Sequence, residues 1–224
     1  SDNSGVEVHT LANPSITAIQ EAYIRKVIDT INDLDNVLYE ITNEDTWSVA
    51  DNSWQYYIIN YIKSYELNKT KQHPVGMTAQ YPGGSNSDLF NSPADWISPA
   101  ESISDPSIAD GSKVIISDTD HHCGLCGDRI WMWKAFARGG NPIIMDGYGS
   151  NDYASAAHAG WRSNNPIWVS MRSNLGYARN YANKMNLAAM TPQNSLSSTG
   201  YILADTINGE YLTYLPSGGS VTVN

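Results

Sequence analysis

The sequence predicts an α/β fold in which a parallel sheet is followed by a short antiparallel β segment. After an opening helix, short β-rich runs and helical stretches follow in the order β, α, β, loop, β, α, β, α. Because each crossover returns the chain in the same direction, this order favours parallel strands. From Thr199 onward, short alternating strands indicate antiparallel hairpins with turns at Asn208-Gly209 and Pro216–Gly219. These strands are Tyr201–Leu203, Glu210–Leu215 and Ser220–Val223.

Two amphipathic helices are predicted in the first part of the chain. The first begins at Asn13-Pro14, where Asn can cap the helix and Pro suits the first helical position. We expect its apolar face to be buried. That face consists of Ile16, Ile19, Tyr23, Val27, Ile28, Ile31 and Leu34. A second helix is expected to begin near Asp51. Its apolar stripe consists of Trp54, Tyr57, Ile58, Tyr61, Ile62 and Tyr65.

The predicted strands of the parallel sheet are short and separated by helices or loops. They are Val37–Thr42, His73–Ala79, Val114–Ser117 and Pro142–Asp146. A long loop is expected over Tyr81–Ser112, interrupted only by the brief Asp95–Ile97, and loops of such length are usually functional or mobile. Further helices are expected at Arg129–Arg138 and from Pro166 to Met185.

Composition restricts the classes of partner. The chain has 13 basic and 23 acidic residues, and its net charge of −10 argues against nucleic acid and anionic lipid. Seven Trp and fourteen Tyr against two Phe are typical of polar clefts, carbohydrate sites among them, but also of ordinary protein surfaces. No apolar run is long enough to cross a bilayer, so no membrane partner is expected. We expect the full-length protein to be secreted or periplasmic.

Carboxylates follow the predicted strands. They are Glu44, then Asp118 and Asp120, then Asp146. In a barrel of parallel strands such positions converge on one face. In an extended segment, Asp118 and Asp120 share a face. Two carboxylates across a sugar are what glycoside cleavage requires. Any single one of these acids can instead cap a helix or play a structural part.

These residues carry a resemblance to a known family. The segment LYEITNE resembles the strand-4 signature of the clan A glycoside hydrolases, which are TIM barrels. This resemblance implies that Glu44 is the general acid/base and that Asn43 holds a sugar hydroxyl. The order of segments along the chain, from YIRKVIDTINDLDNVLYEITNE to GEYLTYLPSGGSVTV, resembles apiosidase-related bacterial glycosidases more closely. In these proteins a small β-domain described as collagen-binding follows the barrel. Residues 1–195 would then be barrel and residues 196–224 the start of that β module.

The chain departs from the clan pattern in two ways. The clan's nucleophile is a Glu that ends strand 7, whereas this chain offers DTDHH, so Asp118 or Asp120 must serve. The side chain is shorter by about 1.5 Å, which favours inversion through water. In addition, only strands 4 to 8 of a (β/α)8 TIM barrel are present. We therefore expect a fragment of a longer gene product, inactive alone, with sheet edges covered by a second copy or by the tail.

Other candidate residues lie close to the strand ends. We expect His121 to touch sugar or orient an Asp, and Asp146 to contact substrate. Aromatic residues that could stack on a sugar ring are Trp47, Trp96, Trp131 and Tyr148. Packing in the core or anchoring of a loop is the alternative for each of these rings.

The two cysteines allow a further interpretation. His121, His122, Cys123 and Cys126 have zinc-ligand side chains, but a single CxxC without a distant partner pair favours a local disulfide or two free thiols. No cofactor is therefore expected. The sequence predicts a glycoside hydrolase-like protein that acts on polysaccharide. The alternatives are a non-catalytic carbohydrate-binding or interaction protein on the same scaffold and, less favoured, a zinc-dependent hydrolase.

Overall fold

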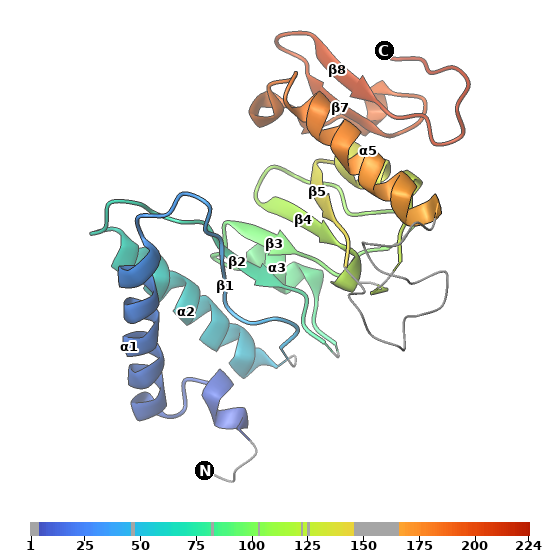
Figure 1. The fold of residues 1–224 in the computed structure, drawn as a ribbon. Helices are drawn as coiled ribbons and strands as arrows, with labels where there is room; N and C mark the ends of the chain where they lie inside the picture. Colours follow the sequence, from blue (N-terminus) through green and yellow to red (C-terminus); the bar gives the residue numbers. More distant parts are fainter. Residues whose placement is uncertain are drawn as a thin grey trace. The chain divides into compact units, whose positions relative to one another are not determined.

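The structure is a computed structural model that describes residues 5–45, 48–81, 83–102, 104–121, 123–124, 126–145 and 166–224. Its contacts divide the chain into two compact units, Ser1–Ser98 and Pro99–Asn224 (Figure 1). Both units combine helices with parallel strands, and the second also holds an antiparallel sheet. The mixed α/β class predicted from the sequence is confirmed.

The two long helices of the first unit are α1 (Pro14–Ile31) and α2 (Val49–Glu66), and a 3-10 turn, η1 (Val6–His9), precedes them. α1 begins as predicted, with the Asn13 side chain accepting the N–H of Ser15. α2 begins slightly earlier than expected because the Ser48 hydroxyl caps it by accepting the N–H of Asp51. The helices lie side by side (Figure 1).

Three parallel strands complete the first unit: β1 (Tyr39–Glu40), β2 (Val75–Thr78) and β3 (Trp96–Ser98). β1 and β2 are shorter than predicted. The predicted long loop contains both β3 and the short helix α3 (Asn86–Asn91). All four residues of β2 are buried. At Gly76 the Trp96 indole lies so close that an added Cβ would meet it at 1.9 Å, so only glycine fits there.

The predicted apolar face of α1 is largely uncovered, contrary to expectation. Only Ile28 is fully buried, whereas Ile19 and Tyr23 are each 70% exposed. These residues line an open pocket of about 550 Å³, together with Trp54 and Ile58 of α2 and other residues of α1, β1 and α2. The stripe is not buried because, among the described residues of the first unit, nothing fills this pocket.

A ladder of tyrosines on α2 makes the contact with α1 polar. Tyr57, Tyr61 and Tyr65 stack in succession, with ring centroids 6.4 and 6.5 Å apart. Their hydroxyl groups each hydrogen bond a charged side chain of α1. These partners are Glu21, Arg25 and Asp29. The tyrosines, predicted as part of a buried stripe, therefore mediate a half-exposed polar contact between the helices.

A buried ion pair ties the ends of several elements of the first unit together. The Glu66 carboxylate accepts hydrogen bonds from His73 Nδ1 at 2.8 Å, from the His73 N–H at 2.6 Å and from the Tyr39 hydroxyl at 3.1 Å. The other ring nitrogen of His73 lies 2.8 Å from the carbonyl oxygen of Leu34. Both nitrogens thus face acceptors, which favours the doubly protonated ring. Burial alone would lower the pKa of His73, but these hydrogen bonds outweigh it and raise that pKa.

In the second unit, β4 (Val114–Asp118) and β5 (Gly140–Ile143) are parallel, and α4 (Arg129–Ala137) connects them. The Asp128 carboxylate caps α4 by accepting the N–H of Ile130 and Trp131. α5 (Pro166–Ala182) packs on α4 through an apolar core. The fully buried members of that core are Trp131, Met132, Phe136, Trp168, Met171 and Ala178.

The last part of the chain forms an antiparallel three-stranded sheet, as predicted. Its strands are β6 (Thr191–Pro192), β7 (Ile202–Asp205) and β8 (Glu210–Thr213), and the 3-10 turns Leu187–Ala189 and Asn194–Leu196 flank β6. The predicted strand at Ser220–Val223 is reduced to one bridge between Ser197 and Val223. β6 precedes the predicted module yet pairs with β7, and the domain boundary at residue 196 stays a prediction. None of the helices in the described segments has the length and apolar character that a membrane span requires.

Candidate active site

Glu44 lies in the loop that follows β1, which ends at Glu40 rather than at the predicted Thr42. The φ of Glu44 is 48°, which makes Glu44 the one non-glycine residue in the left-handed region among those that the structure describes. This backbone conformation costs about 1–2 kcal/mol for a residue with a Cβ. Such strain persists only where neighbouring contacts impose it, and it clusters at functional sites. Glu44 is half-buried, and the neighbouring Asn43 is exposed.

The residue after Glu44, Asp45, is buried and has contacts through both its side chain and its main chain. One carboxylate oxygen of Asp45 lies 2.8 Å from Nδ1 of His9, and the carbonyl oxygen of Asp45 accepts the N–H of Tyr81 at 3.1 Å. The His9 ring stacks on Trp54 at a centroid distance of 4.9 Å. The chain that follows Glu44 is therefore fixed on both its side-chain and main-chain sides.

Further polar side chains gather where β1 and β2 end. The Thr78 hydroxyl lies 2.9 Å from the Glu40 carboxylate and 3.1 Å from the carbonyl oxygen of Thr42. The Gln80 amide donates to the Asn52 side chain at 2.9 Å, and both are buried. Polar groups are thus buried beside the carboxyl ends of parallel strands, the edge at which α/β proteins usually bind ligands.

The second unit carries the other predicted acids. Asp118 is the last residue of β4 and has the parity of Val114 and Ile116, as expected. Asp120 does not continue that parity, because residues 119 to 121 form the 3-10 turn η2 (Thr119–His121). The Asp118 carboxylate accepts the N–H of Asp120 at 3.0 Å, and this local hydrogen bond competes with an extended backbone. The expectation that Asp118 and Asp120 share one strand face is therefore wrong.

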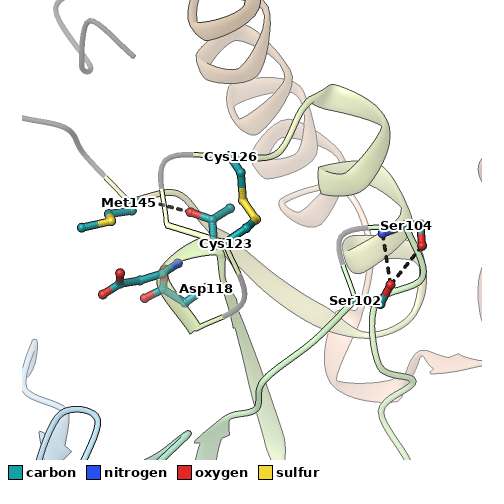
Figure 2. The surroundings of a disulfide bond; sticks show 8 residues. Ser102, Ser104, Asp118, Cys123, Cys126 and Met145 are labelled. Atoms are coloured by element: carbon teal, nitrogen blue, oxygen red, sulfur yellow. Dashed lines mark hydrogen bonds between the residues drawn. A yellow bond between two sulfur atoms is a disulfide. The ribbon is translucent and has the colours of Figure 1, made fainter. Parts of the chain in front are cut away.

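A disulfide between Cys123 and Cys126 closes the loop after η2 (Figure 2). The N–H groups of Cys123 and Gly124 both donate to the carbonyl oxygen of Thr119, at 2.9 and 2.8 Å. The Thr119 hydroxyl in turn accepts the N–H of Met145 at 2.8 Å. The disulfide is one of the two states that the sequence left open, and it occupies both sulfur atoms that a zinc site would need.

Sequence reasoning missed Glu101, a buried acid in the second unit. Burial raises the pKa of Glu101 to about 7, although the hydroxyl of Ser117, the N–H of Ser107 and the charge of Arg138 all favour the ionised form. The Ser107 N–H donates to one carboxylate oxygen at 3.1 Å. The other oxygen and the Ser117 hydroxyl are neighbours outside strict hydrogen-bond geometry, and neither has another partner among the described residues.

Glu101 and the predicted acid Asp118 lie on opposite faces of β4, because Glu101 neighbours the Ser117 side chain. The Ser117 side chain points to the opposite face of the strand from Asp118, since successive residues alternate. A signal for Glu101 was present in the sequence, because it closely follows the short run at Trp96 that became β3. The other acidic site candidates are acids that follow predicted strands, and Glu101 meets the same criterion.

The remaining predicted site residues have varied environments. His121 is half-buried in η2. Trp131 is 2% exposed inside the α4–α5 core, and Trp96 is 6% exposed over Gly76, which favours the packing roles that the sequence left open. Three predicted contact residues lie outside the described residues. They are Trp47, Asp146 and Tyr148.

The candidate residues thus divide between the two units of the chain. Asn43 and Glu44 belong to the first unit, and Asp118, Asp120 and His121 belong to the second. We find no protein-family model, curated protein or solved structure that matches the sequence or the fold of this chain.

Proposed function

We propose that this chain is part of a (β/α) barrel of glycoside hydrolase type, which cleaves glycosidic bonds in a polysaccharide with two carboxylates. Glu44 is the general acid/base, and Asp120 or Asp118 is the second carboxylate. Asn43 and His121 assist by binding substrate. The observation that carries the proposal is Glu44 itself, because the acid of the Asn-Glu pair follows a parallel strand and is held in a left-handed backbone conformation beside buried polar groups.

The chemistry requires the two carboxyl groups to act in opposite protonation states. Glu44, protonated, gives its proton to the glycosidic oxygen as the bond from that oxygen to the anomeric carbon breaks. In an inverting reaction the ionised Asp removes a proton from water, whose oxygen attacks the anomeric carbon. In a retaining reaction the Asp oxygen attacks directly. Glu44 then takes a proton from the water that cleaves the glycosyl ester.

The separation of the carboxyl groups decides between these courses. Retention requires a distance of about 5–5.5 Å, and inversion about 6.5–9.5 Å. Because an Asp stands where the clan has a Glu, we propose inversion. An experimental structure with Glu44 more than about 10 Å from both Asp118 and Asp120 would exclude either course.

The decisive test compares leaving groups on the full-length protein. Glu44→Gln should lower the hydrolysis of an unactivated oligosaccharide by about 10²–10⁴-fold. The loss should be much smaller for nitrophenyl glycosides, whose leaving group needs little protonation. Glu21→Gln, which makes the same charge change on α1, serves as the matched control and should leave both rates unchanged. Equal losses on both substrate classes would argue against Glu44 as the acid.

The second candidate is a non-catalytic carbohydrate-binding protein on the same scaffold. It is favoured by the use of the Asp118 carboxylate as a local acceptor for the N–H of Asp120, the kind of turn contact that a structural Asp makes. Retained binding of polysaccharide by a wild-type protein that releases no sugar from any substrate would favour this candidate over the hydrolase.

A further inference from the structure

We infer that His9 and Asp45 form a positioning pair that holds Glu44 in its left-handed backbone conformation. His9 lies in η1, far from Glu44 in the chain, and sequence reasoning gave it no role. The physical claim concerns only the coupling between this pair and the conformation of Glu44. Its catalytic meaning rests on the proposed function.

The pair combines a buried carboxylate with a partly exposed imidazole. The Asp45 side chain is 4% exposed and the His9 side chain 38% exposed, and Oδ1 of Asp45 lies 2.8 Å from Nδ1 of His9. A buried carboxylate needs a hydrogen-bond donor to stay ionised. Nδ1 of His9 therefore carries a hydrogen whether the ring is neutral or charged, which fixes the tautomer of the neutral ring.

The His9 ring is itself held in place by two helices. It stacks on Trp54 of α2 with an interplanar angle of 29°. The Trp54 indole N–H donates to the Gln20 side chain at 3.1 Å, and the Gln20 amide donates to the carbonyl oxygen of Val8 at 2.6 Å. These contacts connect His9 in η1 to α2, then to α1, and then back to the main chain of η1. The imidazole therefore has little freedom to follow Asp45 if Asp45 moves.

The constraint passes from Asp45 to Glu44 through their shared peptide unit. His9 fixes the Asp45 side chain, and the Tyr81 N–H fixes the Asp45 carbonyl oxygen at 3.1 Å. Rotation of Glu44 out of the left-handed region would turn the following peptide and break at least one of these contacts. Without His9, we expect Glu44 to relax toward negative φ.

A double-mutant cycle on the full chain tests the coupling. Glu44→Gly should raise the folding equilibrium constant of the wild type by about 3–10-fold, because glycine adopts positive φ without the cost borne by Glu, although the larger backbone entropy that glycine loses on folding reduces the gain. In a His9→Phe background, which keeps the ring over Trp54 but removes the Nδ1–H donor, the gain should fall below about two-fold, since Glu44 has already relaxed. An equal gain in both backgrounds would overturn the inference.

Two further measurements keep the result interpretable. Asp45→Asn provides a second background, and Glu7→Gln, a charge change within the same η1 turn, should leave the gain from Glu44→Gly intact. The three-bond coupling between the amide and Hα protons of Glu44 should change in the His9→Phe and Asp45→Asn variants and stay constant in Glu7→Gln. An unchanged coupling in the first two variants counts against the positioning pair even if their stability falls.

The catalytic consequence is measured separately on the full-length protein. If it hydrolyses glycosides, His9→Phe should lower kcat at least ten-fold and change KM less than two-fold, because substrate contacts remain while the acid loses its orientation. An unchanged kcat would show that the pair does not serve catalysis. A positive stability cycle without any hydrolysis would refute the proposed function and leave the positioning pair standing.

Discussion

The buried carboxyl of Glu101 should make the protein less stable as the pH rises toward neutrality. Glu101 is 8% exposed, and burial raises its pKa from the ordinary 4.5 to about 7. Between these two pKa values, Glu101 loses its proton in the unfolded chain and keeps it in the folded protein. Since the folded state binds more protons, the free energy of unfolding decreases with increasing pH.

The size of the effect follows from the two pKa values. At about 1.4 kcal/mol per pH unit, the interval from 4.5 to about 7 amounts to about 3 kcal/mol. Glu101→Gln replaces the acid with a neutral side chain of the same shape. The variant should match the wild type within about 1 kcal/mol at pH 4.5 and exceed its stability by about 3 kcal/mol at pH 8.

Urea unfolding between pH 4.5 and 8, followed by tryptophan fluorescence, measures this difference. Other titrating groups, the buried His73 among them, are common to both proteins and cancel in the comparison. Asp33→Asn, a charge change at an exposed position, should follow the wild-type curve. If the Glu101→Gln variant and the wild type keep a constant stability difference from pH 4.5 to 8, the pKa of Glu101 is not raised by burial.

Three other predictions concern stability and association. His73→Ala should lower stability by about 3–5 kcal/mol near pH 6, because a buried carboxylate loses its partner. Since the pair raises the pKa of His73, the loss should shrink as the pH rises through that pKa, as urea unfolding at pH 6 and 9 will show. Gly76→Ala should destabilise by about 1–3 kcal/mol through overlap with the indole on β3, whereas Gly176→Ala in α5, with open space around it, should stabilise by about 1 kcal/mol. If a second copy covers the open apolar pocket at α1, light scattering should detect dimers that Ile19→Glu converts to monomers; a wild-type monomer would contradict this.

The longer helices could be predicted well because their signals are local, whereas the short α3 lies in a segment predicted to be a loop. The start of α1 is encoded by Asn13-Pro14 and that of α4 by Asp128, and both caps are present in the structure. Strand limits were less accurate, since pairing with neighbours decides them. β3 has only three residues, too few for a period of two to stand out, and it is its pairing in the sheet, with β2 among others, that identifies it as a strand.

Only the part of the candidate site that depends on local sequence could be predicted. The strand preceding Asp118 could be recognised from its apolar run, but the turn that follows depends on a side-chain hydrogen bond. Glu101 depends on burial and His9 on a partner distant in the chain, and neither property belongs to a local segment. The burial of Glu101 and the partner of His9 arise from tertiary contacts, so they cannot be predicted from the spacing of residues along the sequence.

The tyrosine ladder between α1 and α2 has a consequence for how the first unit comes apart. Its hydroxyl groups bond charged side chains that water can solvate equally well, and α1 buries only one residue completely. Detaching α1 therefore exposes only one fully buried residue of that helix, Ile28, and breaks hydrogen bonds of the ladder that solvent can replace. Amide hydrogens of α1 should exchange with deuterium well before those of α2, so that this helix opens as a separate low-energy step while the strands beneath α2 stay paired.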